Sequence, residues 1–292
     1  MAEALNAASQ GAPTAPPAKA LEVEGLSKVF GRRGGAEVVA VDAVSFTVAR
    51  GGSLAIVGES GSGKTTTARM IIGLERPTAG RIVIGGRERG IRRASSRERR
   101  RMGREVQIVF QDPYSSLDRR QRVRDCLDEV LRLHFALSRG EREARIGELL
   151  AQVGLDERHA GVYPRALSGG QQQRVAIARA LASEPSLLIL DECVASLDVS
   201  VQAQVLNLLA DIREQTGVTY LFISHDLAVV RQVSDEVVVM RRGAIVERGQ
   251  TDRVLDAPQH PYTRALLMAV PRRGWKPVRS RFLETQTLEE EP

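Results

Sequence analysis

The chain has 292 residues, of which 42% are hydrophobic and 27% charged. This balance excludes wholesale disorder and collagen-like repeats, and it supplies enough apolar material for a core. No run approaches the roughly 18 consecutive apolar residues that span a bilayer. The two cysteines, Cys126 and Cys193, cannot form a disulfide framework or a four-cysteine metal site within one chain, which suits a reducing cytoplasm.

The net charge is +6 and the isoelectric point is near 9.8. Such a charge is compatible with binding to nucleic acid, anionic lipid headgroups or an acidic ligand, and equally with an arginine-rich solvated surface. Between positions 29 and 275, Lys64 is the only lysine among 36 arginines. In such a composition a lone lysine suggests a position that requires a compact ammonium group.

The first part of the chain has patterns of short strands and one helix. Residues 1–20 are rich in Ala and Pro, do not have the pattern of a secretory signal, and are expected to form a disordered leader. Alternating or continuous apolar residues then predict strands over 21–26, 37–49, 54–58 and 81–86. A helical pattern covers 65–74 and ends before Pro77.

The second part alternates strand and helix patterns. Residues 87–104 hold nine arginines and two glutamates and are read as a basic, polar segment. A mostly helical stretch at about 113–165 is interpreted as an insertion between two strands of a sheet, and Ser168 is expected to cap a helix over 168–183. Further strands are predicted over 105–111, 187–192, 219–224, 236–240 and 244–249, and an amphipathic helix over 201–215. This alternation predicts an α/β fold with a largely parallel sheet.

A glycine-rich loop follows the buried strand that ends at position 58. Residues 58–65, GESGSGKT, match the pattern G-x-x-x-x-G-K-[ST], whose backbone N–H groups cradle phosphates at the positive end of the next helix. Lys64 is expected to reach the β- and γ-phosphates, and Thr65 to give its hydroxyl to Mg²⁺. The strand before the motif and the helix after it disfavour a simple glycine-rich turn. The glycines that let the backbone curl are Gly58, Gly61 and Gly63.

Two acids, Asp191 and Glu192, follow the hydrophobic strand that begins at position 187. An acid at the end of a strand parallel to the loop-bearing strand is placed to hold the Mg²⁺ shell, and a second acid can polarise the attacking water. Alone, such a pair is a weak signal, because many acids at strand ends are simply solvated. Together with the glycine-rich loop, the pair predicts a site for ATP and Mg²⁺.

Residues 167–174, LSGGQQQR, distinguish between families that have such a loop. With the other motifs, the chain resembles the ATP-binding cassette (ABC) ATPases over roughly 21–271. The motifs occur in the family order: GESGSGKTT from 58, VFQDP from 109, LSGGQ from 167, LLILDE from 187, SLD from 196 and ISHD from 223. An ordinary P-loop kinase or GTPase gives no account of LSGGQ or ISHD.

The resemblance implies a domain organisation. It implies an ABC ATPase domain of the P-loop α/β class over 21–257, with an antiparallel β-subdomain and a helical subdomain at about 113–165. Residues 258–292 would form a C-terminal extension and tail of the oligopeptide-importer type.

The resemblance also implies roles around the bound nucleotide. Phe30 stands where the family stacks an aromatic ring on adenine, although a core position is the alternative. Gln111 would sense Mg²⁺ and the attacking water, Glu192 would be the general base, and His225 would contact the γ-phosphate. The nucleotide-binding loop would comprise Gly58, Ser60, Gly61, Gly63, Lys64, Thr65 and Thr66, and the metal would be held by Thr65, Gln111 and Asp191.

A second set of residues would act on another subunit. In the family, the signature helix caps the γ-phosphate of ATP bound by a partner cassette, so that two cassettes enclose two ATP molecules. One chain alone should therefore hydrolyse ATP poorly. The residues expected at this dimer interface are Ser168, Gly169, Gly170, Gln171 and Asp198.

Within the family, three stretches resemble the oligopeptide and dipeptide importer ATPases, which include nickel and glutathione importers. They are VFQDPYSSLD from 109, LDVSVQAQVLNLL over 197–209 and HPYTRALLMAVP over 260–271. The stretch DPYSSL within the first of them is more similar to the second of the two ATPases that such importers commonly pair. A heterodimer is therefore expected. Such a subunit lies on the cytoplasmic face of the cell membrane, bound to two permeases that work with an extracytoplasmic substrate-binding protein. No cysteine lies beyond Cys193, so no iron–sulfur site is expected.

The basic charge also raises an alternative to transport. A non-transport ABC ATPase that acts on nucleic acid or ribosomes suits the basic charge. However, the chain has no long coiled-coil insertion and no second cassette, and we expect no nucleic-acid partner. The arginine-rich stretch 87–104 stays open between a solvated surface and a face for acidic headgroups or a partner. The transported substrate cannot be read from the sequence.

Overall fold

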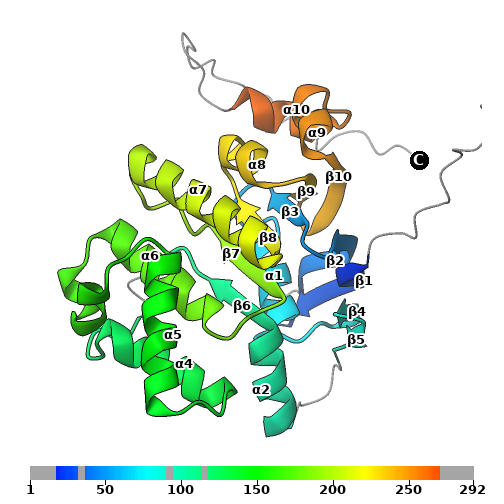
Figure 1. Ribbon diagram of the computed structural model, residues 1–292. Coiled ribbons are helices and arrows are strands. Elements are labelled where there is room, and N and C mark those ends of the chain that lie inside the picture. The colour runs from blue at the N-terminus through cyan, green and yellow to red at the C-terminus, as the bar shows by residue number, and fades with distance from the viewer. Residues whose placement is uncertain (1–17, 32–36, 90–94, 113–116, 270–292) are drawn as a thin grey trace, which may run out of the picture.

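The computed structural model describes residues 18–31, 37–89, 95–112 and 117–269. The leader expected over 1–20 lies outside the described residues up to position 17, but Lys19 and Ala20 begin the first strand, with Ala20 buried. The tail beyond position 269 also lies outside the described residues. In Figure 1 two sheets lie against each other, and a group of helices projects from one side of the larger sheet. None of the helices in the described ranges is long and apolar enough to cross a membrane.

The smaller sheet is antiparallel and has the strand order β2-β1-β4-β5. Its strands are β1 (Lys19–Phe30), β2 (Val38–Ala49), β4 (Ala79–Ile84) and β5 (Arg87–Glu88). This confirms the strands expected near the N-terminus. The first of them is longer than its apolar alternation predicts, because pairing with β2 continues through several register irregularities as far as Phe30.

The larger sheet has the order β10-β9-β3-β8-β7-β6, and every neighbouring pair except β9 and β10 is parallel. The strands are β3 (Ser53–Val57), β6 (Val106–Val109), β7 (Leu187–Asp191), β8 (Thr219–Ser224), β9 (Glu236–Arg241) and β10 (Ala244–Gln250). Because β3, β7 and β8 are adjacent and parallel, their carboxyl ends meet at one edge of the sheet, as ligand sites of open α/β sheets require.

Both faces of the larger sheet are covered, one mainly by helices and the other by α1 (Lys64–Ile72) and the smaller sheet, so its central strands β3, β7 and β8 are buried along their whole length. Along β7, Leu188 and Leu190 pack in one hydrophobic cluster, while Leu187 and Ile189 pack in a second cluster on the other face. The helices are α1 (Lys64–Ile72), α2 (Ser96–Glu105), α4 (Val123–His134), α5 (Arg139–Gln152), α6 (Gly169–Leu181), α7 (Val199–Thr216), α8 (Leu227–Val233), α9 (Thr251–Asp256) and α10 (Pro261–Met268).

The helical insertion contains α4, α5 and two short 3₁₀ helices, Glu157–Gly161 and Pro164–Ala166. These elements lead into α6 and form the group that projects from the sheet in Figure 1. The insertion was expected at about 113–165, and its helices lie in that range. Residues 113–116 fall outside the described part of the chain.

One segment has a structure that its sequence pattern did not predict. The basic stretch includes helix α2, which has no buried residue and therefore no apolar stripe to reveal it. Ser95 caps this helix by accepting a hydrogen bond from the backbone N–H of Glu98. The short helix α8 was also missed, because seven residues give little room for a helical period.

Candidate nucleotide site

The loop between β3 and α1 requires glycine at two positions where the backbone passes other strands. Gly58 has φ 153°, and a Cβ atom there would lie 2.2 Å from the carbonyl oxygen of Met240. Gly63 has φ 103°, and a Cβ atom there would lie 2.5 Å from the carbonyl oxygen of Ala40. Any side chain at either position would displace backbone, so the glycine pattern has a steric reason.

Helix α1 begins at Lys64 without a side-chain cap and without an acidic residue in its first turn. By contrast, Ser168 caps α6 and Asp198 caps α7 with side-chain oxygens. The first N–H groups of a helix need partners, and the positive end of the helix dipole favours an anion. The start of α1 is therefore open to a phosphate group.

The Lys64 ammonium lies inside the loop, with only 5% of the residue exposed. Its Nζ atom donates hydrogen bonds to the carbonyl oxygens of Gly58 and Glu59, each at 2.7 Å. Burial lowers the pKa of Lys64, while the nearby carboxylates of Glu192, Asp191 and Glu59 act in the opposite direction. The lone lysine of the arginine-rich region thus occupies a site that fits a compact ammonium.

Asp191, the last residue of β7, lies beside the start of α1. The Thr65 hydroxyl donates to its Oδ1 atom at 3.5 Å. Burial, and then the neighbouring charge of Glu192, raise the pKa of Asp191 to about 6. A buried carboxyl with a hydroxyl beside it is a set of hard oxygen donors, which is the donor chemistry that Mg²⁺ prefers.

The raised pKa of Asp191 has a consequence for stability. The folded chain binds the proton of the Asp191 carboxyl more tightly than the unfolded chain does. The free energy of unfolding therefore falls as pH rises from about 4 to about 6, and above about pH 6 the destabilisation by the buried carboxylate is complete. We expect Asp191→Asn to raise the unfolding free energy of the nucleotide-free protein by about 1–3 kcal/mol at pH 8. Denaturant unfolding of the wild type and the variant measures this difference in unfolding free energy. At pH 4, where the wild-type carboxyl is largely protonated in the folded chain, the difference should largely disappear.

Asp198→Asn is the matched control for that experiment. Hydrogen bonds from the Ser200 hydroxyl and the Val201 N–H lower the pKa of Asp198, which is the opposite direction. Its amide variant should therefore not stabilise the protein at pH 8. If both variants have the same effect, burial of the Asp191 charge does not explain it.

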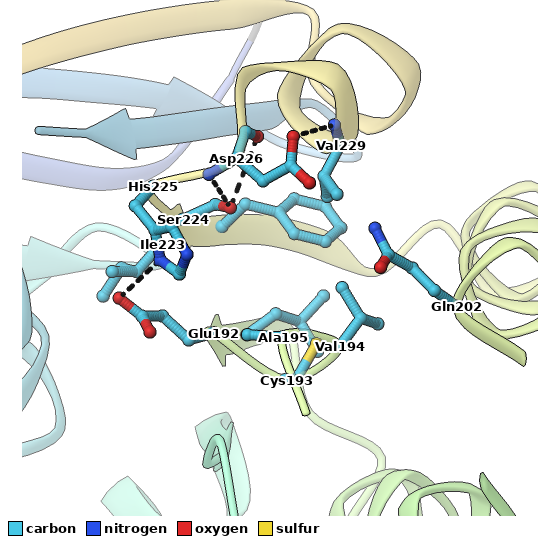
Figure 2. A pocket seen from close by; sticks show the side chains of 12 residues that line it. Glu192, Cys193, Val194, Ala195, Gln202, Ile223, Ser224, His225, Asp226 and Val229 are labelled. Atoms are coloured by element: carbon cyan, nitrogen blue, oxygen red, sulfur yellow. Dashed lines mark hydrogen bonds and ion pairs between the residues drawn. The ribbon is translucent and has the colours of Figure 1, made fainter. Parts of the chain in front are cut away.

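Glu192 and His225 approach each other from the ends of neighbouring strands, as Figure 2 shows. The Nδ1 atom of His225 lies 3.3 Å from Oε1 of Glu192. Glu192 has φ 48°, in the left-handed region that non-glycine residues rarely adopt. Its N–H donates to the carbonyl of Ile223 at 2.9 Å, which holds this turn against β8. Strained backbone of this kind clusters at functional sites.

A small cavity of about 80 Å³ lies beside this pair and is lined in part by Cys193 and by Gln202 of α7. Burial raises the pKa of the Cys193 thiol to about 12, so the thiol stays protonated at neutral pH.

Gln111 follows the end of β6 and is exposed. Its carbonyl oxygen accepts a hydrogen bond from the Ser196 hydroxyl at 3.4 Å. This contact joins the segment after β6 to the segment after the acid pair. The amide side chain of Gln111 makes no hydrogen bond within the described residues.

The signature residues form a second group. Ser168 and Gln171 exchange hydrogen bonds in a capping box at the start of α6. A Cβ atom at Gly170 would lie 2.4 Å from Cγ1 of Val201, so α6 and the start of α7 pack closely at this glycine. Gly169 lies near Leu197, which precedes Asp198. The signature and the expected interface aspartate are therefore neighbours.

The structure thus divides the predicted site residues into two sets. Lys64, Thr65, Asp191, Glu192 and His225 converge at one edge of the larger sheet. Counting only residues that the structure describes, no hydrogen bond or ion pair joins them to the signature set from Ser168 to Gln171. Of the remaining predicted residues, Ser60 lies exposed in the loop, and Thr66 is half-buried in the first turn of α1.

Phe30 ends strand β1 and is 40% exposed, with Nζ of Lys28 4.7 Å from its ring centre. The ring is therefore not a core residue, which removes the alternative reading of this position. An exposed aromatic face is available for stacking.

One contact of the loop was missed by sequence reasoning. The hydroxyl of Tyr262 in α10 accepts a hydrogen bond from the Glu59 N–H at 3.1 Å. The two residues are 203 positions apart. In the sequence, HPYTRALL indicates only the importer subfamily, and no local spacing pattern links it to the loop.

Together, the glycine-rich loop with its G-x-x-x-x-G-K-[ST] pattern, the open start of α1 and the acid pair are typical of a P-loop nucleotide-binding protein. Comparison with known proteins specifies the class. A model of the ABC transporter family matches residues 41–195, and a model described as the oligopeptide/dipeptide transporter C-terminal region matches residues 246–289. The chain belongs to the ABC transporter family, and it is an ATP-binding ATPase of that family.

Two curated relatives are similar over most of the chain. The di/tripeptide transport ATP-binding protein DppF of Pseudomonas aeruginosa is 49% identical, across 82% of this chain and 73% of its own length. The oligopeptide transport ATP-binding protein AppF of Bacillus subtilis is 46% identical, across 86% of this chain and 78% of its own length.

Solved cassettes have the same fold. The cbiO1 protein of Clostridium perfringens, part of the ABC transporter complex cbiONQ, has a TM-score of 0.73 and 29% identity, covering 82% of this chain and 92% of its own. The cassette MJ0796, solved as a dimer in a post-hydrolysis state with ADP and phosphate, has a TM-score of 0.70 and 28% identity. The match covers 79% of this chain and 98% of the MJ0796 chain. These similarities confirm the predicted fold class.

Proposed function

We propose that the chain is the ATP-binding and ATP-hydrolysing subunit of an ABC importer for oligopeptides or dipeptides. One observation carries this proposal: the cassette and the C-terminal region described for oligopeptide/dipeptide transporters occur in a single chain. The relatives DppF and AppF, which are named as di/tripeptide and oligopeptide transport ATP-binding proteins, support it. No specific observation on the described residues favours action on nucleic acid.

Magnesium fits the oxygen donors at the start of α1. Thr65 and Asp191 would hold the ion, with Gln111 completing the set from the segment after β6. When bound, Mg²⁺ would neutralise charge on the β- and γ-phosphates of ATP. The burial of the Asp191 carboxyl supports this assignment, because a nearby cation offsets the cost of the buried charge.

Hydrolysis would be carried out by groups of this chain around the γ-phosphate. The Lys64 ammonium would leave its loop carbonyls and bind the β- and γ-phosphates. The Glu192 carboxylate would accept a proton from the attacking water as general base. His225 would orient this carboxylate through its Nδ1 atom and contact the γ-phosphate. Phe30 would stack on the adenine ring.

A second subunit would complete each site. The separation of the signature set from the loop supports an in-trans role, in which Ser168, Gly169, Gly170 and Gln171 bind the γ-phosphate held by the partner. Asp198 would lie at this interface, next to the signature. The solved dimer of the similar cassette MJ0796 is consistent with such a pair. We propose a heterodimer with a second ABC ATPase.

We expect Ser168→Arg to leave ATP binding by the isolated chain unchanged and to block turnover in the assembled dimer. The reason is that Arg would project into the partner's phosphate site. Titration of ATP and ATPase rates measure the two effects. Ser138→Arg is the matched control, since Ser138 also caps a helix with a capping box and is exposed. Loss of ATP binding by the isolated Ser168→Arg chain would contradict the in-trans role.

The remaining partners would be membrane components. We propose two permeases, contacted by the segment at about 112–135 that includes α4, and an extracytoplasmic binding protein that selects the substrate. The chain would then lie on the cytoplasmic face of the membrane. Its domain limits would be those expected above, with the ATPase domain over 21–257, the helical subdomain at about 113–165 and the importer-type extension after it.

The test is a pull-down of the tagged Glu192→Gln variant from its native membranes with ATP, followed by mass spectrometry. Recovery of two permeases, a second ATPase and a binding protein is the expected result. Recovery of ribosomal or DNA-associated proteins without a permease would overturn the transport function but leave the nucleotide chemistry in place.

A further inference from the structure

The C-terminal helix α10 is fixed to the larger sheet at its first residues. Glu247 of β10 accepts hydrogen bonds from the backbone N–H groups of Gln259 and His260, at 2.7 and 3.1 Å. The ring nitrogen Nδ1 of His260 caps the helix by accepting from the N–H of Tyr262 at 3.1 Å. Pro261 occupies the first turn, where a missing N–H costs nothing. These contacts set the direction in which Tyr262 points.

Tyr262 reaches from this helix to the nucleotide-binding loop. Only 5% of the residue is exposed, and the guanidinium of Arg241, at the end of β9, lies 4.9 Å from its ring centre. Its hydroxyl accepts the hydrogen bond from Glu59 N–H described above. A buried tyrosine hydroxyl normally requires such a partner.

The same peptide unit is held at its other end by the nucleotide-binding lysine. The N–H of Glu59 and the carbonyl of Gly58 belong to one planar peptide group. The N–H donates to Tyr262, and the carbonyl accepts from Nζ of Lys64 at 2.7 Å. This peptide group follows directly on the last residue of β3, so it is the point at which the loop leaves the strand. Only glycine fits at position 58, because the backbone there passes close to Met240.

We propose that Tyr262 is a positioning residue for ATP binding, and that the C-terminal extension is thereby part of the nucleotide site. Its hydroxyl fixes the orientation of the peptide group between Gly58 and Glu59. The loop then keeps its phosphate-binding shape when Lys64 leaves the Gly58 carbonyl for the phosphates. Preorganisation of this kind lowers the ordering cost of binding. The proposal rests on the phosphate-binding role of the loop and not on the importer assignment.

The test is Tyr262→Phe in the full chain, which removes the hydroxyl and keeps the ring against Arg241. We expect the Kd for ATP to rise roughly fivefold, the effect of one lost hydrogen bond, and the Kd for ADP to rise equally. In ATPase assays KM should rise while kcat at saturating ATP stays unchanged. Tyr163→Phe is the matched control, because Tyr163 is half-buried and stacks with arginines in the helical subdomain.

A double-mutant cycle tests whether the effect passes through the Glu59 N–H. Glu59→Pro removes that N–H, so adding Tyr262→Phe to it should cause no further loss of ATP affinity. Wild-type ATP affinity in Tyr262→Phe, with or without a lower melting temperature, would overturn the proposal. So would an undiminished Tyr262→Phe effect in the Glu59→Pro background. Neither measurement needs a permease, so failure here is distinct from failure of the importer assignment.

Discussion

The Glu192→Gln variant should bind ATP normally and hydrolyse it about 10²–10⁴ times more slowly than the wild type. The amide keeps the size of the side chain but cannot accept a proton from water. In the proposed mechanism ATP is bound by the loop and by the start of α1, which this substitution leaves unchanged. We also expect the variant to accumulate as an ATP-bound dimer, because slow hydrolysis leaves the two cassettes closed around ATP. Size-exclusion chromatography in the presence of ATP measures this dimer.

Glu184→Gln is a suitable control for this experiment. Glu184 also has a left-handed backbone, with φ 54° against 48° for Glu192, and it is exposed and pairs with Arg104 and Arg145. Any general effect of glutamine in such a turn should appear in both variants. Near-normal turnover in Glu192→Gln would remove Glu192 as the general base.

Replacement of Lys64 should abolish nucleotide binding at ordinary concentrations. Loss of charge-assisted hydrogen bonds to phosphate should weaken ATP binding by about 10²-fold or more in Lys64→Ala. Lys64→Arg should fail as well, although it keeps the charge. The ammonium lies between two carbonyl oxygens at 2.7 Å in a nearly buried position, and a planar guanidinium is too large for that space.

Titration with a fluorescent ATP analogue measures both Lys64 variants. Lys19→Ala is the control, since Lys19 lies on the exposed start of β1 and pairs with Glu22. Wild-type affinity in Lys64→Ala would contradict the phosphate-binding role of the loop. Wild-type affinity in Lys64→Arg alone would show that charge matters there and size does not.

The sequence by itself determined the elements whose reasons are local. The buried strand, glycine-rich loop and helix at 54–74 were predicted correctly, because apolar periodicity, glycine and a phosphate-binding pattern all act within a few residues. The N-cap at Ser168 and the strands of the larger sheet followed in the same way. The order of short motifs was sufficient to predict the family, since each motif is contiguous.

The tertiary structure decided which distant residues meet. The order β3-β8-β7 brings Lys64, Asp191 and His225 to one edge of the sheet, and only the folded chain raises the pKa of Asp191 by burying it. Helix α2 escaped prediction because a helix without a buried face leaves no apolar period. Tyr262 was missed as a partner of the loop because a contact across 203 positions depends on packing of α10 against β10, and no local pattern encodes such a contact.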